Sequence, residues 1–258
     1  MSAPVFVDAQ ASDAAVGSVV TVTGAEARHA VTVQRRAVGE IVDVVDGQGR
    51  RVRGEIVATG TDSMTVAVSV VTRDDDPPVT LVQALAKGGR DEQAVEAAVE
   101  LGVTAVVPWS AQRSIVQWRG PKAEKARQKW ADLVWAATKQ SRRATLAPVA
   151  AVVTSRELAV QVASATASGV RVLILHEESA TPLTTLTWAD PAQPVWIVVG
   201  PEGGIGDEEV ALLTDAGAES VVLGQHVLRA SSAGPAAIAA LAATRGTWAD
   251  AALRGGLR

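Results

Sequence analysis

Short runs of valine dominate the first third of the chain, and Gly or Asp interrupts each of them. The runs VVTVTG, EIVDVVDGQG, RVRGEIVATG and SMTVAVSVV all lie between residues 19 and 71. In the last run Met64, Val66, Val68 and Val70 alternate with small or polar residues, the period-two pattern of a strand with one buried face. This pattern predicts a small β-barrel or sandwich.

The hydrophobic pattern changes after residue 73. Residues 73–78 (RDDDPP) combine three like charges with two prolines, which cannot continue a strand ladder and favour an extended connection. From residue 79 onward, apolar strands alternate with helical patterns, which is typical of a parallel sheet covered on both faces. The sequence therefore predicts two domains, a β-rich domain over residues 1–73 and an α/β domain over residues 79–258.

Four apolar runs of the α/β domain are predicted to be strands, at residues 79–86, 103–109, 170–178 and 194–200. A helix is predicted over residues 91–102, because acidic residues occupy its first turn and a glycine ends it. A second helix is predicted over residues 127–143, where apolar residues recur at helical spacing and basic residues lie near both ends.

Two glycine-containing segments near the C-terminal end, residues 195–210 and 221–241, each lead from an apolar strand through a tight turn into a helix. In open α/β sheets, ligands bind where the strands end at their carboxyl edge. The two turns therefore predict one shared crevice.

These turns do not match the motifs that bind nucleotide phosphates. No Lys follows Gly204 or Gly206 as a P-loop requires, and GPEGGIG does not fit the dinucleotide fingerprint Gly-x-Gly-x-x-Gly. Asp207, Glu208 and Glu209 fill the first turn of the next helix and would cap its amides, so we do not expect the crevice to prefer an anion. S-Adenosylmethionine fits such turns, because it combines an adenine, a ribose and a positive charge without a phosphate.

The composition favours a soluble intracellular protein without a metal. The 258 residues include no Cys, which excludes disulfides, thiolate zinc sites and cysteine nucleophiles, and the three His residues are widely spaced. No apolar run reaches the roughly 18 residues that a membrane-spanning helix needs, and the first residues do not resemble a signal peptide. We expect a cytoplasmic protein that binds no membrane.

Charge is distributed unevenly along the chain, whose net charge is −4. Residues 87–143 carry eleven Lys and Arg against six Asp and Glu, whereas the flanking segments are acidic overall. Such a segment is typical either of a solvated helical face or of a surface that binds a polyanion. Charge alone leaves both interpretations open.

The glycine-rich turns and several shorter motifs together resemble a known family. Three of the motifs are GPEGG at 200–204, LGQHVLR at 223–229 and ALAKGGR at 84–90. A fourth is the N-terminal pattern His29-x3-Val33-x-Arg35-x3-Gly39. The set is completed by Glu100-Leu101-Gly102, Pro108, Arg113-Ser114 and Gln140-Ser141-x-Arg143. It is similar to the SPOUT class of methyltransferases and, within that class, to the bacterial ribosomal RNA uracil-N3 methyltransferases of the RsmE type.

The resemblance implies a PUA-like β-barrel over residues 1–73 and, over residues 79–258, a SPOUT α/β domain with a parallel sheet and a deep trefoil knot. It also implies a homodimer and a pocket for S-adenosylmethionine formed by three turns. The implied pocket residues are Leu175, His176, Gly200, Glu202, Gly203, Gly204, Leu223, Gly224, Val227, Leu228 and Arg229.

The implied reaction methylates N3 of a uridine in 16S ribosomal RNA. Because the methyl group of S-adenosylmethionine is already activated on a sulfonium, aligning it with N3 is the main task. Arg229 is the candidate catalytic residue, since a guanidinium can stabilise the uracil anion that develops. The chain has Ser231-Ser232 where the family commonly has Glu-Thr, and Ser231 is predicted to be the N-cap of the last helix.

Under this interpretation the basic segment binds RNA, with Lys and Arg on phosphates supplying most of the affinity. The candidate RNA contacts are Arg35, Arg36, Lys87, Arg113, Arg142 and Arg143. The chain has no Tyr and one Phe, so platforms for base stacking are scarce. This favours a folded target with a flipped-out uridine, as in an assembled small ribosomal subunit.

Two other functions are alternatives. A non-catalytic RNA-binding ribosome assembly factor would keep the barrel and the basic segment but would not bind S-adenosylmethionine. A small-molecule hydrolase would use ASSAG at 230–234 as a nucleophile turn, but the segment lacks the glycine before the serine and a paired His-Asp. Such a hydrolase would turn over esters without a methyl donor.

Overall fold

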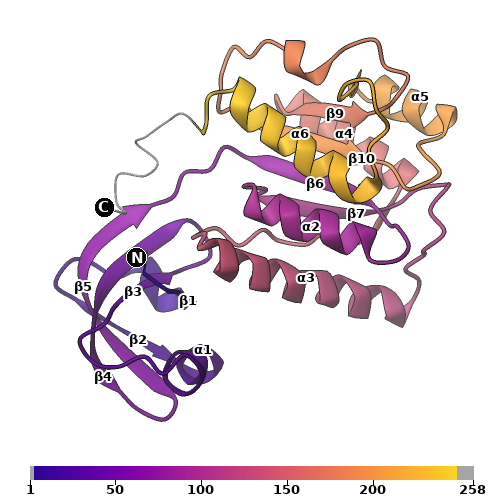
Figure 1. The fold of residues 1–258 in the computed structure, drawn as a ribbon. Coiled ribbons are helices and arrows are strands. Elements are labelled where there is room, and N and C mark those ends of the chain that lie inside the picture. Colours follow the sequence, from indigo (N-terminus) through magenta and orange to yellow (C-terminus); the bar gives the residue numbers. More distant parts are fainter. Residues whose placement is uncertain (1–2, 249–258) are drawn as a thin grey trace. The chain divides into compact units, whose positions relative to one another are not determined.

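The computed structural model describes residues 3–248, so the first two residues of the predicted β-rich domain and residues 249–258 of the predicted α/β domain lie outside the described residues. The described chain forms two compact units that divide between Asp76 and Pro77, within the predicted connection. Residues 138–146 belong to the first unit, and residues 147–248 return to the second. Each unit contains its own sheet (Figure 1).

The first unit is built on a five-stranded sheet with the strand order β1-β3-β4-β5-β2. β1 pairs parallel with β3, and the other pairs are antiparallel. The alternation predicted for the fifth strand is confirmed for Met64, Val66 and Val68, which are buried, whereas Val70 is 39% exposed. The elements are β1 (Val5–Val7), η1 (Ala9–Ser12), β2 (Val19–Thr23), α1 (Gly24–Arg28), η2 (His29–Val33), β3 (Ile41–Val45), β4 (Arg50–Thr59) and β5 (Ser63–Arg73).

The second unit is built on a six-stranded sheet with the order β11-β9-β10-β6-β7-β8, and all its strand pairs are parallel. The central strands are buried on both faces, as expected of a parallel sheet covered by helices. The predicted α/β fold is therefore confirmed. The strands are β6 (Val79–Ala84), β7 (Ala105–Ser110), β8 (Val153–Thr154), β9 (Arg171–Leu175), β10 (Val195–Val199) and β11 (Glu219–Val221).

Helices cover both faces of this parallel sheet (Figure 1). α2 (Arg90–Glu100) and α6 (Ala230–Thr244) pack together on one face, and α4 (Ser155–Ala167) and α5 (Asp207–Asp215) pack together on the other. A short 3-10 helix, η3 (Leu183–Thr185), follows β9. Among residues 3–248, no helix is both long and apolar enough to cross a bilayer.

The helix predicted over residues 127–143 is real, but its predicted boundaries are wrong at both ends. α3 spans Pro121–Ser141. It begins early because Pro is well suited to the first helical position, where its missing N–H costs no hydrogen bond. It ends at Ser141 because Arg142 has a left-handed φ of 59°, the conformation that commonly terminates helices.

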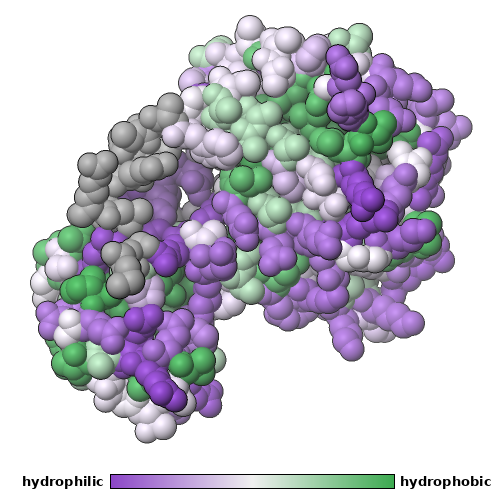
Figure 2. Space-filling model, viewed as in Figure 1, coloured by the Kyte–Doolittle hydropathy of each residue, from purple (hydrophilic) through white to green (hydrophobic). Residues whose placement is uncertain are grey.

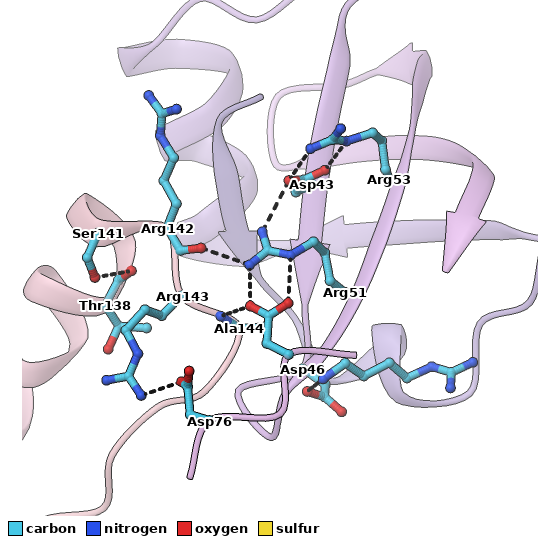
Figure 3. A network of polar contacts seen from close by, with 12 residues as sticks. Asp43, Asp46, Arg51, Arg53, Asp76, Thr138, Ser141, Arg142, Arg143 and Ala144 are labelled. Atoms are coloured by element: carbon cyan, nitrogen blue, oxygen red, sulfur yellow. Dashed lines mark hydrogen bonds and ion pairs between the residues drawn. The ribbon is translucent and has the colours of Figure 1, made fainter. Parts of the chain in front are cut away.

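A buried network of charges holds residues 138–146 within the first unit (Figure 3). Arg51, which is 5% exposed, donates hydrogen bonds to Asp43 at 3.1 Å, to Asp74 at 2.6 Å and to the carbonyl of Arg142 at 2.8 Å. Asp74 also accepts from the N–H of Ala144 at 3.2 Å. Burial disfavours the charged guanidinium, but the two carboxylates outweigh it and raise the pKa of Arg51 above its usual value.

Candidate functional site

Three loops meet at the carboxyl edge of the parallel sheet. Loop A (residues 176–179) follows β9, loop B (200–206) follows β10, and loop C (222–229) follows β11. These strands are adjacent in the sheet and parallel, so their carboxyl ends lie at one edge. The backbone N–H of His176 donates to the carbonyl of Val221 at 2.9 Å, which joins the ends of β9 and β11.

The loops enclose a cavity of about 630 Å³, within the size range typical of small-molecule sites. The shared crevice predicted from the two glycine-rich turns is therefore present. The structure also brings all the implied pocket residues to the lining of this cavity, and their role in binding stays a prediction. They are Leu175, His176, Gly200, Glu202, Gly203, Gly204, Leu223, Gly224, Val227, Leu228 and Arg229.

Loop B is a tight turn that requires glycine. A Cβ atom on Gly200 would lie 2.6 Å from Cγ1 of Ile205, which is closer than packed atoms allow. Gly204 has a φ of 74°, a left-handed conformation that other residues rarely adopt. The glycines therefore let the main chain itself line the cavity.

The carboxylate of Glu202 in loop B is held by the loop that follows β6. Its Oε1 accepts from the backbone N–H of Lys87 at 3.0 Å and from Nη1 of Arg90 at 3.3 Å. The loop after β6 is itself fixed by Asp91, whose carboxylate accepts from the N–H of Ala86 at 3.1 Å. Burial raises the pKa of this carboxyl group above its usual value. The charge of Glu202 is thus balanced within the protein.

Arg113 fixes loop B from the segment after β7. Its Nη1 donates to the carbonyl of Gly203 at 3.0 Å, and its side chain lines the cavity. Sequence reasoning assigned Arg113 to RNA contact only, without a place at the cavity. The geometry puts its guanidinium at the cavity lining, where it also shapes the turn.

Glu209 joins three segments around loop B. This side chain is 1% exposed, and its carboxylate accepts from the N–H of Gln112 at 2.9 Å, the hydroxyl of Ser155 at 2.5 Å and the N–H of Gly206 at 3.4 Å. The predicted capping of the α5 amino end thus holds for Glu209. It is wrong for Asp207 and Glu208, whose carboxylates make no hydrogen bond with another described residue, and Asp207 lines the cavity.

Several cavity residues were missed at the sequence level. Glu177 and Glu178 of loop A, Asp207 of α5 and Arg90 of α2 all lie in the lining. Their positions in the sequence could have indicated a place at the cavity. The two glutamates lie at the carboxyl end of a predicted strand, and Arg90 ends the motif ALAKGGR. Carboxylates beside apolar side chains suit a ligand that carries both a positive charge and a flat apolar ring.

The prediction that Ser231 is the N-cap of α6 is wrong. The helix begins at Ala230, and Arg229 is the N-cap residue, with an extended backbone at φ −66° and ψ 153°. The carbonyl of Arg229 accepts from the N–H of Ser232 at 2.8 Å and of Ala233 at 3.0 Å, so Ser231 already lies inside the first turn. Residues 230–234 are therefore helical and do not form the strand-to-helix turn that a hydrolase nucleophile needs.

The six candidate RNA contacts differ in exposure. Arg35 and Arg142 are exposed, and they are the two non-glycine residues with positive φ among the described ones, at 55° and 59°. Lys87 is exposed beside loop B. Arg36 is half-buried and pairs with Glu40 at 2.9 Å.

Arg143 differs from the other five, because its side chain is 9% exposed and it pairs with Asp76 at 2.8 Å. A buried, paired guanidinium offers no surface to a phosphate. This burial and pairing argue against an RNA contact of Arg143, which stays a prediction, and indicate a structural role in the first unit. In the described part of the chain, no group of three or more His, Asp or Glu side chains is arranged to hold a metal ion.

Comparisons with known proteins agree with this architecture. A family model described as an RNA methyltransferase domain matches residues 74–242, and one described as an RNA methyltransferase PUA domain matches residues 22–69. Ribosomal RNA small subunit methyltransferase E of Mycobacterium tuberculosis is 39% identical over 234 residues, which cover 90% of this chain and 89% of that protein. The protein of the same name from Synechocystis sp. is 32% identical over 229 residues, which cover 87% and 73%.

A solved structure has the same fold. The ribosomal RNA small subunit methyltransferase E from Neisseria gonorrhoeae, bound to S-adenosyl methionine, superposes with a TM-score of 0.81 at 29% sequence identity. The superposition covers 93% of this chain and 97% of that one.

Proposed function

The chain belongs to the ribosomal RNA small subunit methyltransferase E family, and from this membership we propose that it methylates N3 of a uridine in 16S ribosomal RNA, with S-adenosylmethionine as donor. The observation that carries the proposal is the cavity at the carboxyl edge of the sheet, lined by loops A, B and C. The relatives favour an enzyme over a non-catalytic assembly factor, since they are named as methyltransferases.

The cavity residues fit S-adenosylmethionine in three ways. Leu175, Leu223 and Leu228 offer apolar surface for the adenine ring. Glu177 and Glu178 offer carboxylates for the positive charges of the donor. The glycines of loop B offer backbone groups at close range, and the similar structure from Neisseria gonorrhoeae is described as bound to the same compound.

When bound, the donor supplies a methyl group already activated on a sulfonium. The protein must then align the uracil and stabilise the negative charge that develops as N3 loses its proton. Arg229 suits that role, because its exposed side chain lines the cavity and makes no hydrogen bond or ion pair with another described residue. Its main chain is fixed by the first turn of α6, so the guanidinium extends from a rigid position.

Residues 1–73 serve as a PUA-like RNA-binding domain and residues 79–258 as a SPOUT methyltransferase domain in this proposal. Support comes from the two family matches, at 22–69 and 74–242, and from the division of the described chain at residue 76. The chain of the methyltransferase domain forms a deep trefoil knot near loops B and C. The family resemblance is the support for the knot. General rules of chain topology would not predict it, because true knots are nearly absent among folds.

The protein acts as a cytoplasmic homodimer on the assembled small subunit in this proposal. The outer side of α6 supports a dimer, because Ala236, Ala239, Ala240 and Ala243 are all at least partly exposed along it. Figure 2 shows pale green, weakly hydrophobic residues gathered over this helix. An exposed stripe of small apolar residues is suited to close packing against a second helix.

Purified protein incubated with labelled S-adenosylmethionine and small subunits that lack the modification is expected to label the 16S RNA at N3 of one uridine. Mass spectrometry of the digested RNA locates the modified base. Label on a cytosine, label on transfer RNA or no label at all would contradict the proposed substrate. A parallel reaction with naked 16S RNA shows whether the assembled particle is required.

Replacing Arg142 with glycine is expected to weaken RNA binding without weakening the fold. Its backbone has a left-handed φ of 59°, where glycine is favoured, so the free energy of unfolding should change by less than about 1 kcal/mol. Figure 3 shows its side chain pointing away from the buried network, while its carbonyl accepts from Arg51 and would still do so in the variant. The slope of log affinity against log salt concentration should fall by about 0.7 to 0.9, the value for one lost phosphate contact. An unchanged slope would remove Arg142 from the RNA-binding surface.

A further inference from the structure

The amino end of α3 presents an exposed group of basic residues that lies within the basic segment 87–143 but is not among the six candidate RNA contacts. Arg119, Lys122 and Lys125 form this group, which we call the α3 basic surface. All three side chains are exposed, and none makes an ion pair or hydrogen bond with another described residue. The next two basic residues of the helix differ, because Arg127 pairs with Glu124 and Lys129 pairs with Glu92.

The position of these charges is unfavourable for the isolated protein. The amino end of a helix carries a partial positive charge, so cations there are repelled and anions are attracted. Lys122 and Lys125 lie in the first two turns of α3, on the same side of the helix, and Arg119 lies just before them. The acidic residue of the first turn, Glu124, pairs with Arg127, so these three cations have no ion-pair partner among the described residues and indicate an anionic partner outside the chain.

The α3 basic surface is connected to the cavity by a short, fixed segment. At the cavity end, Gln112 is held by Glu209 and Arg113 by the carbonyl of Gly203. At the helix end, the ring of Trp118 packs edge-on against the buried Trp130, with ring centroids 5.0 Å apart. The chain from Arg113 to Arg119 therefore spans at most about 20 Å.

The chain reaches the amino end of α3 from the edge of the sheet where the cavity lies. Figure 1 shows the segment after β7 leading from the carboxyl edge of the sheet to the amino end of α3. Figure 2 shows hydrophilic side chains over the region that α3 occupies. A chain-like anion that enters the cavity can thus continue over the amino end of α3.

We propose that the α3 basic surface binds backbone phosphates of the substrate RNA beside the nucleotide that enters the cavity. This inference rests on the proposed function, because it takes the substrate to be RNA. Three cations spread over an extended surface fit a polyanion better than a single small anion. RNA is the polyanion that the proposed reaction must bring to the cavity.

The test replaces Arg119, Lys122 and Lys125 together with glutamine. The Michaelis constant for RNA should rise about tenfold or more, and the slope of log affinity against log salt concentration for purified 16S RNA should fall by about 2. The turnover number at saturating RNA and the affinity for S-adenosylmethionine should stay as in the wild type. A slope equal to that of the wild type would overturn the inference.

Two controls separate RNA binding from folding and from charge in general. Arg156→Gln removes one exposed, unpaired charge from α4 of the same unit and should leave the slope unchanged. Lys122→Glu with Lys125→Glu should keep or raise the melting temperature, because anions favour the first turns of a helix, while RNA affinity falls. A fall in both would indicate damage to the fold and contradict the inference.

Failure of this inference and failure of the proposed function give different results. If the wild type methylates no RNA, the proposed function fails. If the wild type methylates RNA and the triple variant matches it in every constant, only the inference fails. If the triple variant binds naked RNA normally but loses activity on assembled subunits, the surface contacts a ribosomal protein and the inference is overturned.

Discussion

Replacing Arg229 with alanine is expected to lower kcat about 100-fold to 1,000-fold, while the dissociation constant of S-adenosylmethionine changes little. The side chain lines the cavity without a partner among the described residues, so its removal breaks no contact that shapes the pocket. Its carbonyl, which accepts the first hydrogen bonds of α6, stays in place in the variant. The loss should therefore fall on the step in which the uracil becomes negatively charged. Single-turnover rates with labelled donor and calorimetry of donor binding measure the two effects separately.

The variant Arg229→Lys provides the matched control. It keeps the positive charge but loses the planar fork of donors, so it should recover part of the rate and leave donor binding unchanged. Equal losses of rate and donor affinity in Arg229→Ala would contradict the catalytic role, because they would show that Arg229 only shapes the pocket.

The α/β unit and its cavity were largely predictable from sequence, because both depend on local patterns. Buried parallel strands appear as apolar runs such as VWIVV of β10, and glycine turns mark their carboxyl ends. Since parallel strands end at one edge, two such turns indicate one site without knowledge of the strand order. The chemistry of the two turns already indicated S-adenosylmethionine, and the family resemblance added the residues at the carboxyl end of β9, Leu175 and His176.

Helix boundaries were less predictable, since they depend on single residues at the ends. Pro121 starts α3 earlier than the apolar spacing indicates, and the left-handed Arg142 ends it where glycine would normally be expected. At α6, Ser231 has the composition of an N-cap, but the helix begins at Ala230 with no side-chain cap.

The pairing of charges could not be predicted, because it joins residues distant in sequence. The aspartates of residues 74–76 look like a solvated connection, yet Asp74 pairs with Arg51 and Asp76 with Arg143. The same contacts bring residues 138–146 into the first unit, although the pattern assigns them to the second domain. A basic residue counted from sequence as a candidate for RNA can thus be a structural partner, as Arg143 is.

Replacing Arg51 with alanine is expected to lower the free energy of unfolding of the first unit by about 3 to 5 kcal/mol. The side chain of Asp43 is 2% exposed, and without Arg51 it keeps only Arg53 as a charged partner, at 2.7 Å. Asp74 loses its guanidinium partner, and the carbonyl of Arg142 loses its donor. Residues 138–146 should then be held less firmly, because their hydrogen bond to Arg51 of β4 is lost while other contacts, such as Lys139 with Glu26, remain. Urea denaturation gives the free energy, and hydrogen exchange of the β3 and β4 amides assigns the loss to this unit.

Two further variants define the cause of that loss. Arg28→Ala removes an arginine of the same unit whose ion pair with Asp62 is exposed, with side chains 61% and 60% accessible, and should cost at most about 1 kcal/mol. Arg51→Met keeps most of the side-chain volume but not the charge, so it should be nearly as unstable as Arg51→Ala, because the carboxylates still lack their partner. Full recovery of stability in Arg51→Met would show that packing, rather than the buried charges, holds this part of the fold together.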